Sequence, residues 1–284
     1  MPGPGLLSPR RSDPEPGYDH PERGEQSLFI AARLVTLYIL LLISGVIVLQ
    51  IERAKRGFKV ELRRIAGLEA MDEVVGRATE MGRPIHFSAG VGNLTTRGAP
   101  AMMASLEILG HLAWMSAKYG SRVITTVAQG DVFAVSEEIV KGAYLKAGRP
   151  DEYTPDMVRF LSPSQFAYAG GIAGIINREK CAANVIIGHF AAEAIYIAES
   201  AHLAGAIQIA GTTNMYQLPF FVASCDYTLI GEEIFAAGAY YSKNPVDLGA
   251  LSGQDFTRAF AIVLMLLGVV LATVGNKSLS DWLK

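Results

Sequence analysis

The chain has 284 residues, a net charge of −2 and a sequence pI near 6.2, so no overall basicity points to nucleic acid as a partner. Half of the residues are hydrophobic and the mean hydropathy is +0.27, which fits a membrane protein. The two cysteines, Cys181 and Cys225, lack CxxC or metal-type spacing, so we expect reduced thiols in a cytoplasmic domain.

Residues 1–27 are rich in proline, glycine and charge, and we expect them to form a disordered tail. Leu34–Ile51 follows, with eighteen uncharged and mostly aliphatic residues. A membrane-spanning helix needs about 20 such residues, so we predict a span over 28–51 with Arg33 reaching toward the headgroups. A buried core helix would not have such hydrophilic flanks. A signal peptide would begin earlier and end in a small-residue cleavage site.

Six basic side chains follow the span: Arg53, Lys55, Arg56, Lys59, Arg63 and Arg64. Because lysine and arginine in short loops face the cytoplasm, we predict a cytoplasmic main domain and both termini outside. The same cluster, Arg53–Arg64, is a candidate site for anionic lipid.

Residues 52–83 are expected to form a basic connecting helix. Apolar residues between Phe58 and Ala78 recur every three or four positions, which predicts a helix that stops at Gly82. We favour an apolar stripe that docks on the following domain. A dimeric coiled-coil stalk is the alternative, although the stripe is shorter than three to four heptads.

Residues 84–243 alternate short apolar runs with helical segments, which predicts an α/β domain with a parallel, Rossmann-like sheet flanked by helices. The predicted strands are Ile85–Ser88, Val123–Ala128, Val158–Leu161, Val185–His189, Ile207–Ala210 and Tyr227–Ile230. The predicted helices are Ala101–Tyr119, Val132–Ala147, Gln165–Arg178, Ala191–Ala204 and Met215–Ala223.

A polar linker is expected at 244–255, and a second membrane-spanning helix at 256–275, before a short tail at 276–284. The core of this helix, Ala259–Val274, contains sixteen uncharged residues between Arg258 and Lys277. Its alternative is a hydrophobic helix that packs on the domain.

Small and polar residues follow the predicted strands, and parallel strands place such loops at one edge of a sheet, where ligands bind. The candidate ligand-binding residues are Gly90, Gly92, Asn93, Thr95, Thr96, Asp131, His189, Glu193, Gly211, Thr212, Thr213 and Asn214. Glycines allow a close approach to the backbone, and helix N-termini favour anions, so a phosphate or nucleotide is the expected ligand. The same residues are also ordinary in turns and helix caps, and for Gly90–Thr96 alone we favour a structural turn.

Known catalytic signatures are missing from the sequence. Gly90-x-Gly92 lacks the third glycine of a dinucleotide fingerprint, and no P-loop or GxSxG sequence occurs. His189 and Glu193 are four residues apart, but a capping or packing role is favoured over a metal site, and His111 and His202 are expected to be packing residues. We therefore predict no metal and name neither a catalytic set nor a cofactor.

Three stretches resemble a family of bacterial and archaeal membrane proteins known only as a domain of unknown function: IHFSAGVGNLTT at Ile85–Thr96, VITTVAQGD at Val123–Asp131 and AIQIAGTTNM at Ala206–Met215. The resemblance runs from about Leu28 to the end of the chain. It implies an α/β domain between two terminal membrane helices and transfers no site residues.

Two functions remain open at this point. One is a membrane-anchored binding or scaffold module with an anion or nucleotide pocket at the strand edge. The other is a membrane-associated enzyme that acts on a small phosphorylated or carboxylated substrate. The expected partners are the lipid bilayer and a second copy of the chain, because small residues such as Gly45 and Gly268 permit close helix packing.

Overall fold

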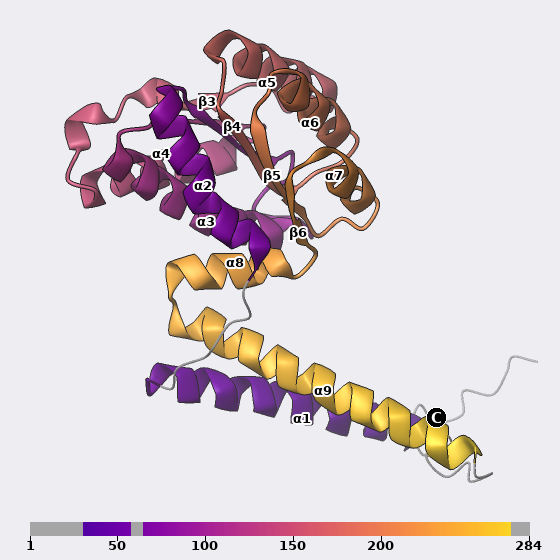
Figure 1. Ribbon diagram of the computed structural model, residues 1–284. Helices are drawn as coiled ribbons and strands as arrows, with labels where there is room; N and C mark the ends of the chain where they lie inside the picture. The colour runs from indigo at the N-terminus through magenta and orange to yellow at the C-terminus, as the bar shows by residue number, and fades with distance from the viewer. Residues whose placement is uncertain (1–30, 58–64, 274–284) are drawn as a thin grey trace, which may run out of the picture. The chain divides into compact units, whose positions relative to one another are not determined.

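The computed structural model describes residues 31–57 and 65–273. Within these residues, six parallel strands form one sheet in the order β3-β2-β1-β4-β5-β6 (Figure 1). The strands are β1 (Ile85–Gly90), β2 (Val123–Val127), β3 (Val158–Phe160), β4 (Ala183–His189), β5 (Ile207–Thr212) and β6 (Tyr227–Ile230). The predicted parallel α/β sheet is therefore confirmed.

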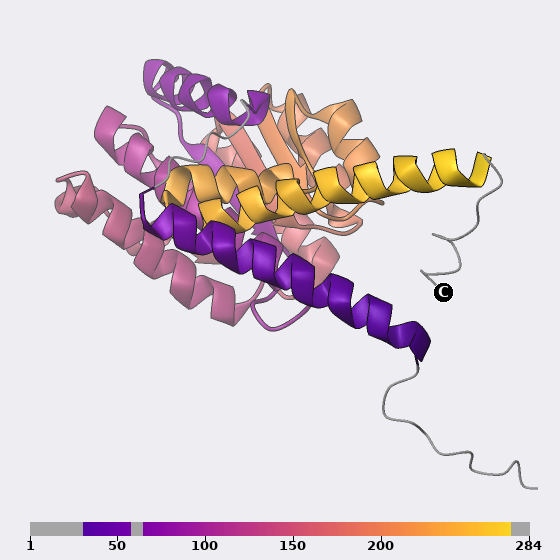
Figure 2. The same ribbon diagram turned by 90° about the horizontal axis from the view of Figure 1, so that it is seen from below.

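Helices cover both faces of the sheet, because each strand is followed by a segment that crosses to the start of the next parallel strand (Figures 1 and 2). One face carries α2 (Ala66–Met81), α3 (Ala99–Tyr119), α4 (Gly130–Lys146) and α8 (Glu233–Ser242). The other carries α5 (Gln165–Glu179), α6 (Glu193–Leu203) and α7 (Leu218–Ser224). Two short 3-10 turns, Pro150–Glu152 and Pro155–Met157, lead into β3.

The helix that follows the basic cluster docks on the domain, as favoured from its apolar stripe. Met71, Val75 and Ala78 of α2 are buried in the larger hydrophobic core. Gly82 ends the helix in a left-handed conformation, with φ at 61°, and the cap amides donate to carbonyls of the last turn. Phe58, where the apolar stripe was expected to begin, lies outside the described residues. Lys59, Arg63, Arg64 and residues 1–27 and 276–284 also lie outside them.

The structure differs from the prediction at 244–255, where helix replaces the expected linker. α8 was not predicted, and α9 begins at Pro245 and continues to Thr273. Asn244 caps α9, because its Oδ1 accepts a hydrogen bond from the amide of Val246 at 3.0 Å. Proline suits the first turn of a helix, where its missing amide hydrogen is not needed.

The chain divides into two compact units, Ser44–Ile262 and the remaining parts of α1 (Ala31–Lys55) and α9. Within Ser44–Ile262, α1 and α9 approach closely at two glycines. A Cβ on Gly249 would lie 2.5 Å from the Ile51 Cα, and one on Gly253 would lie 2.9 Å from the Ile47 Cα. The G-x-x-x-G spacing therefore joins two helices of the same chain.

Two helical segments are long and apolar enough to cross a membrane: Leu37–Lys55 and Pro245–Leu271. Only 6% of the first hydrophobic window and 0% of the second is buried within the protein, unlike the core helix of a soluble domain. Large apolar side chains such as Leu40 and Leu266 are exposed along them. Both helices could therefore span a bilayer.

Candidate functional site

The switch point of the sheet lies between β1 and β4, because the chain order of the strands reverses there. The loops that follow these two strands are joined directly to each other. The amide of Val91 donates to the carbonyl oxygen of His189 at 3.0 Å. The candidate residues after β1 and β4 are therefore brought together.

The glycines at this edge are packed against protein atoms. A Cβ on Gly90, whose φ is +88°, would lie 2.1 Å from the carbonyl oxygen of His189. A Cβ on Gly92 would lie 2.8 Å from both the His189 Cβ and the Met102 Sδ, and one on Gly98 would lie 2.9 Å from the imidazole Cγ. The absence of side chains at 90, 92 and 98 thus makes room for His189.

The loop after β1 satisfies several of its own amides. Asn93 Oδ1 accepts hydrogen bonds from the amides of Thr95, at 3.2 Å, and Thr96, at 2.9 Å. Asp131, at the start of α4, accepts one from the amide of Leu94 at 2.9 Å. These contacts order the loop as an Asx turn that is tied to α4.

The predicted residues after β5 divide between the strand and its loop. Gly211 and Thr212 extend β5 and are buried. Asn214 Nδ2 donates to the carbonyl of Phe190 at 3.0 Å, which links this loop to the one after β4. Thr213 is half-buried. All three loops therefore meet at one edge of the sheet, while the anion site expected there stays a prediction.

Glu193 is fully buried and serves its own helix start. It accepts hydrogen bonds from the amide of Ala191 and from the Gln165 side chain. His189 lies in the cradle of the glycines and Glu193 faces Gln165. In the described parts of the chain, no three His, Cys, Asp or Glu residues are grouped so that they could hold a metal ion.

A row of buried polar side chains crosses the centre of the sheet, and the sequence reasoning missed it. His86 on β1 lies opposite Asn184 on β4, which lies opposite Gln208 on β5. His86 Nδ1 donates to Asn184 Oδ1 at 2.7 Å, and Asn184 Nδ2 donates to Gln208 Oε1 at 3.0 Å. On the other side, Thr126 Oγ1 lies 2.9 Å from His86 Nε2 and donates to it.

The protonation state of His86 follows from these partners. Asn184 Oδ1 can only accept, so Nδ1 carries the hydrogen and Nε2 accepts from Thr126. Burial lowers the pKa of His86 to about 4, and the hydrogen bond to Asn184 only partly opposes this effect. The imidazole is therefore neutral at physiological pH.

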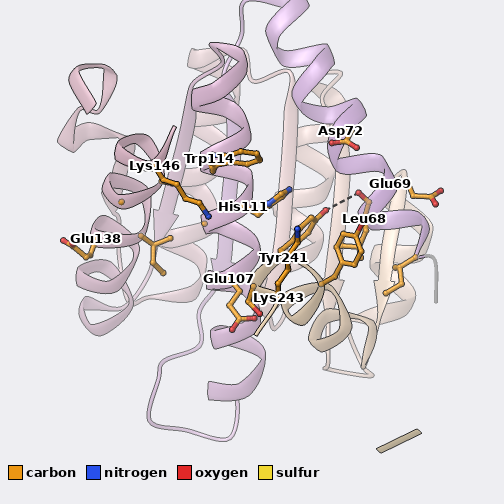
Figure 3. Close-up of a pocket in the computed structure, with 17 residues that line it drawn as sticks. Leu68, Glu69, Asp72, Glu107, His111, Trp114, Glu138, Lys146, Tyr241 and Lys243 are labelled. Carbon is orange, nitrogen blue, oxygen red and sulfur yellow. Dashed lines mark hydrogen bonds between the residues drawn. The ribbon is translucent and has the colours of Figure 1, made fainter. Parts of the chain in front are cut away.

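A pocket of about 870 Å³ lies on the helical layer formed by α2, α3, α4 and α8 (Figure 3). We call it the helical pocket. It is lined by Ile65, Leu68, Glu69, Asp72, Glu107, Gly110, His111, Trp114, Glu138, Ile139, Gly142, Ala143, Lys146, Tyr240, Tyr241, Ser242 and Lys243. Its volume falls within the range of about 300–1,000 Å³ that is usual for small-molecule sites.

Aromatic rings form one wall of the helical pocket. His111 of α3 stacks on Tyr241 of α8, with ring centroids 3.9 Å apart and planes inclined by 17°. Trp114 lies one helical turn away, at 5.6 Å from the His111 ring. The hydroxyl of Tyr241 donates to the carbonyl of Leu68 on α2 at 3.2 Å, so the stack also joins α8 to α2.

Burial lowers the pKa of His111 to about 4, with the positive charges of Lys146 and Lys243 acting in the same direction. The negative charge of Asp72 acts in the opposite direction. His111 is therefore a neutral aromatic surface at physiological pH. His111 packs on Tyr241, whereas His202, for which packing was also expected, is exposed on α6.

Glu107 connects the helical pocket to the start of α9. Its Oε2 lies 2.7 Å from the position that a Cβ on Gly238 would occupy, and the negative charge of Asp247 acts on it. Burial first, and this charge second, raise the pKa of Glu107. Asp247 Oδ2 is itself buried without a hydrogen-bond partner among the described residues.

We expect Glu107→Gln to stabilise the protein at pH 8, by roughly 2 °C in Tm, since it removes repulsion between two carboxylates. The raised pKa means that the folded state holds its proton to a higher pH than the unfolded state. The penalty therefore grows as the pH rises through and above the ordinary glutamate range, and disappears in acid. Thermal unfolding of the full chain in detergent from pH 4 to 8 measures it. A Gln variant no more stable than wild type at pH 8, or an equal gain from the exposed Glu138→Gln, would contradict the account.

Comparison with protein families gives one match: a domain of unknown function (DUF6754) aligns with residues 24–283. No curated protein and no solved structure matches the chain. The expected relation to an uncharacterised domain family, drawn from the loop sequences after β1, β2 and β5, is thus confirmed. The match covers nearly the whole chain, so the α/β domain and both apolar helices lie within the matched region. The chain belongs to the family of the domain of unknown function DUF6754.

Proposed function

We propose that this protein is a membrane-anchored binding module whose α/β domain faces the cytoplasm and takes up a small molecule in the helical pocket. The pocket carries the proposal, since it combines a large volume with an aromatic wall and a few charged groups, the usual composition of a small-molecule site.

The placement of the pocket in the chain supports an anchored module. Its lining begins at Ile65, ten residues after α1 ends at Lys55, and it ends at Lys243, two residues before α9 begins at Pro245. A ligand in the pocket would therefore contact the segments that lead to both apolar helices. The basic residues Arg53, Lys55 and Arg56 favour the cytoplasmic side for the domain.

The chemistry of the described nucleophiles also favours binding over catalysis. Burial raises the pKa of Cys181 and of Cys225 to about 12, so both are thiols at neutral pH and poor nucleophiles. His86, which is neutral, is enclosed in the sheet and bonded at both ring nitrogens. An acid–base role requires a residue within reach of substrate, which a fully buried ring lacks.

A pocket-filling variant tests the proposal. Gly142 lines the pocket, and a Cβ there would meet nothing within 4 Å, so Gly142→Trp introduces an indole ring at a position with room for the first side-chain atom. Gly170→Trp is the matched control, because Gly170 is also an exposed helical glycine with nothing within 4 Å. Both replacements remove a helix-destabilising glycine.

The full-length variants, in detergent, are dialysed against a cell metabolite and lipid extract, and mass spectrometry measures what each retains. We expect wild type and Gly170→Trp to enrich the same compound, with enrichment by Gly142→Trp at least about ten-fold weaker, equivalent to roughly 1.4 kcal/mol. Equal enrichment by all three proteins, or enrichment by none, would refute the helical pocket as a binding site.

A further inference from the structure

Three charged side chains from three different helical segments surround the aromatic wall of the helical pocket. Asp72 comes from α2, Lys146 from the end of α4, and Lys243 directly follows α8. Each acts electrostatically on the same imidazole, that of His111. In Figure 3, Asp72 and Lys146 lie on opposite sides of His111.

None of these three side chains forms an ion pair or hydrogen bond with another described residue. Elsewhere in the domain, oppositely charged side chains do form ion pairs, as Arg159 does with Glu179 at 3.0 Å and Arg149 with Glu152 at 3.1 Å. The pocket thus keeps one negative and two positive groups apart, with neutral rings between them.

The backbone helps to hold Lys243 in place. Lys243 has a φ of 52° and ends α8 in the left-handed conformation, which is unfavourable for a residue other than glycine. Its amide donates to the carbonyl of Ala239 at 3.0 Å. Lys180, outside the pocket, ends α5 in the same conformation, so the cap places Lys243 in the pocket lining but does not by itself require a lysine there.

We infer that the helical pocket binds a dipolar aromatic molecule, with its ring on the His111–Tyr241 wall, its ammonium group toward Asp72 and its acidic group toward Lys146 and Lys243. This inference rests on the proposed binding function and names the ligand class. Ring stacking contributes to affinity together with apolar burial, and each charged end gains an oppositely charged partner.

Molecules with only one charge fit this arrangement less well. An anion would meet Lys146 and Lys243, but the carboxylates of Asp72, Glu69, Glu107 and Glu138 also line the pocket. A cation would meet these carboxylates together with the repulsion of two ammonium groups. A ligand that carries both charges, separated by the width of a ring and a short chain, avoids both conflicts.

The test compares three probes that share a phenyl ring. The dipolar probe, 3-(4-(2-aminoethyl)phenyl)propionate, carries its ammonium and carboxylate on opposite sides of the ring, whereas 2-phenylethylamine has only the positive group and 3-phenylpropionate only the negative one. Calorimetry measures the Kd of each probe for the full-length protein in an uncharged amphipol at low ionic strength. We expect the dipolar probe to bind about five-fold or more tightly than either single-charge probe, given the modest energy of each solvent-accessible charge contact.

Two charge variants sharpen the test, because each should remove only one of the two preferences. In Lys146→Met, the dipolar probe should lose much of its advantage over 2-phenylethylamine, while Lys243 retains the rest. In Asp72→Asn, it should lose its advantage over 3-phenylpropionate. Lys141→Met is the control, since Lys141 is an exposed lysine of α4 outside the pocket lining. It should leave all three Kd values unchanged.

The outcomes separate this inference from the proposed function. A single-charge probe that binds as tightly as the dipolar probe, or variants that weaken all probes equally, would overturn the dipolar ligand class. So would the absence of binding by all three probes. If Gly142→Trp still abolishes retention of a compound from the extract, the binding function survives this result. If it does not, both are refuted.

Discussion

Replacement of His86 by leucine is expected to lower the free energy of unfolding at pH 7 by about 3 kcal/mol or more. Leucine is similar in size to the imidazole but offers no polar atom, so Asn184 Oδ1 loses its donor inside the sheet, and Thr126 Oγ1 keeps only its longer contacts with Tyr168 and the Phe87 carbonyl. Each buried polar group left without a hydrogen bond costs about 1–3 kcal/mol. Denaturant unfolding of the full chain in detergent, followed by the fluorescence of Trp114 in a Trp282→Phe background, measures the change.

The same residue makes the wild-type protein sensitive to acid. Because the folded-state pKa of His86 is about 4, below the ordinary value of 6.5, the unfolded state binds a proton more readily between these values. The free energy of unfolding is therefore highest, as far as His86 determines it, above about pH 6.5. It falls by on the order of 3 kcal/mol as the pH drops toward 4. His111 adds a smaller effect in the same pH range, because it is only partly buried.

His202→Leu provides the control, since His202 is exposed on α6. It should change stability by less than about 0.5 kcal/mol and keep the acid sensitivity. His86→Leu, in contrast, should lose most of the pH dependence between 6.5 and 4. If the two variants behaved alike, the polar row would not contribute to stability in the way described.

Gly90→Ala should be at least as destabilising, with a loss of more than about 3 kcal/mol in the free energy of unfolding. A loss of this size also lowers the yield of folded protein. The added Cβ would lie 2.1 Å from the carbonyl oxygen of His189, which belongs to a central strand and has no room to move. The φ of +88° adds backbone strain for any residue with a side chain.

Gly76→Ala is the matched control, because Gly76 lies in the middle of α2 and a Cβ there would meet nothing within 4 Å. This change should raise stability by about 0.5–1 kcal/mol, the gain expected for alanine in a helix. Thermal unfolding and the yield of folded protein compare the two. A Gly90→Ala protein as stable as wild type would show that β1 and β4 do not approach as closely as described.

The sheet could be predicted from sequence because its strands are short apolar runs with helical segments between them. Tyr227–Ile230 was predicted with the observed bounds, and the other strands differ at their ends by one to two residues. Helix ends were marked by glycines such as Gly82 and Gly120, which adopt positive φ values. These signals are local, so one sequence suffices to recognise them.

The polar row and the helical pocket depend on distant contacts, which no local pattern reveals. The predicted strand began at Val185 and left out Asn184, because a polar residue looked like the end of a strand. Its partner His86 is 98 residues away in the chain. His111, Tyr241 and Asp72 likewise come from three helices and meet only in the folded domain.

α9 was misjudged for a different reason. Gly249 and Gly253 resemble turn residues, and they led to the prediction of a linker. Their spacing of four residues, together with Asn244-Pro245 as a cap, was a signal for a closely packed helix that could have been recognised from the sequence.

The polar row also determines how the central strands align. β1, β4 and β5 each carry the residue that contributes to the polar row at their second position, among apolar residues that would pack almost equally well after a shift of two residues. Such a shift keeps every apolar side chain on its own face, so hydrophobic burial distinguishes the alignments only weakly. It would, however, place His86 opposite Ile186 and leave Asn184 without its partner. The hydrogen bonds between His86, Asn184 and Gln208 therefore select one alignment of the sheet, and with it the positions of all the loops at its edge.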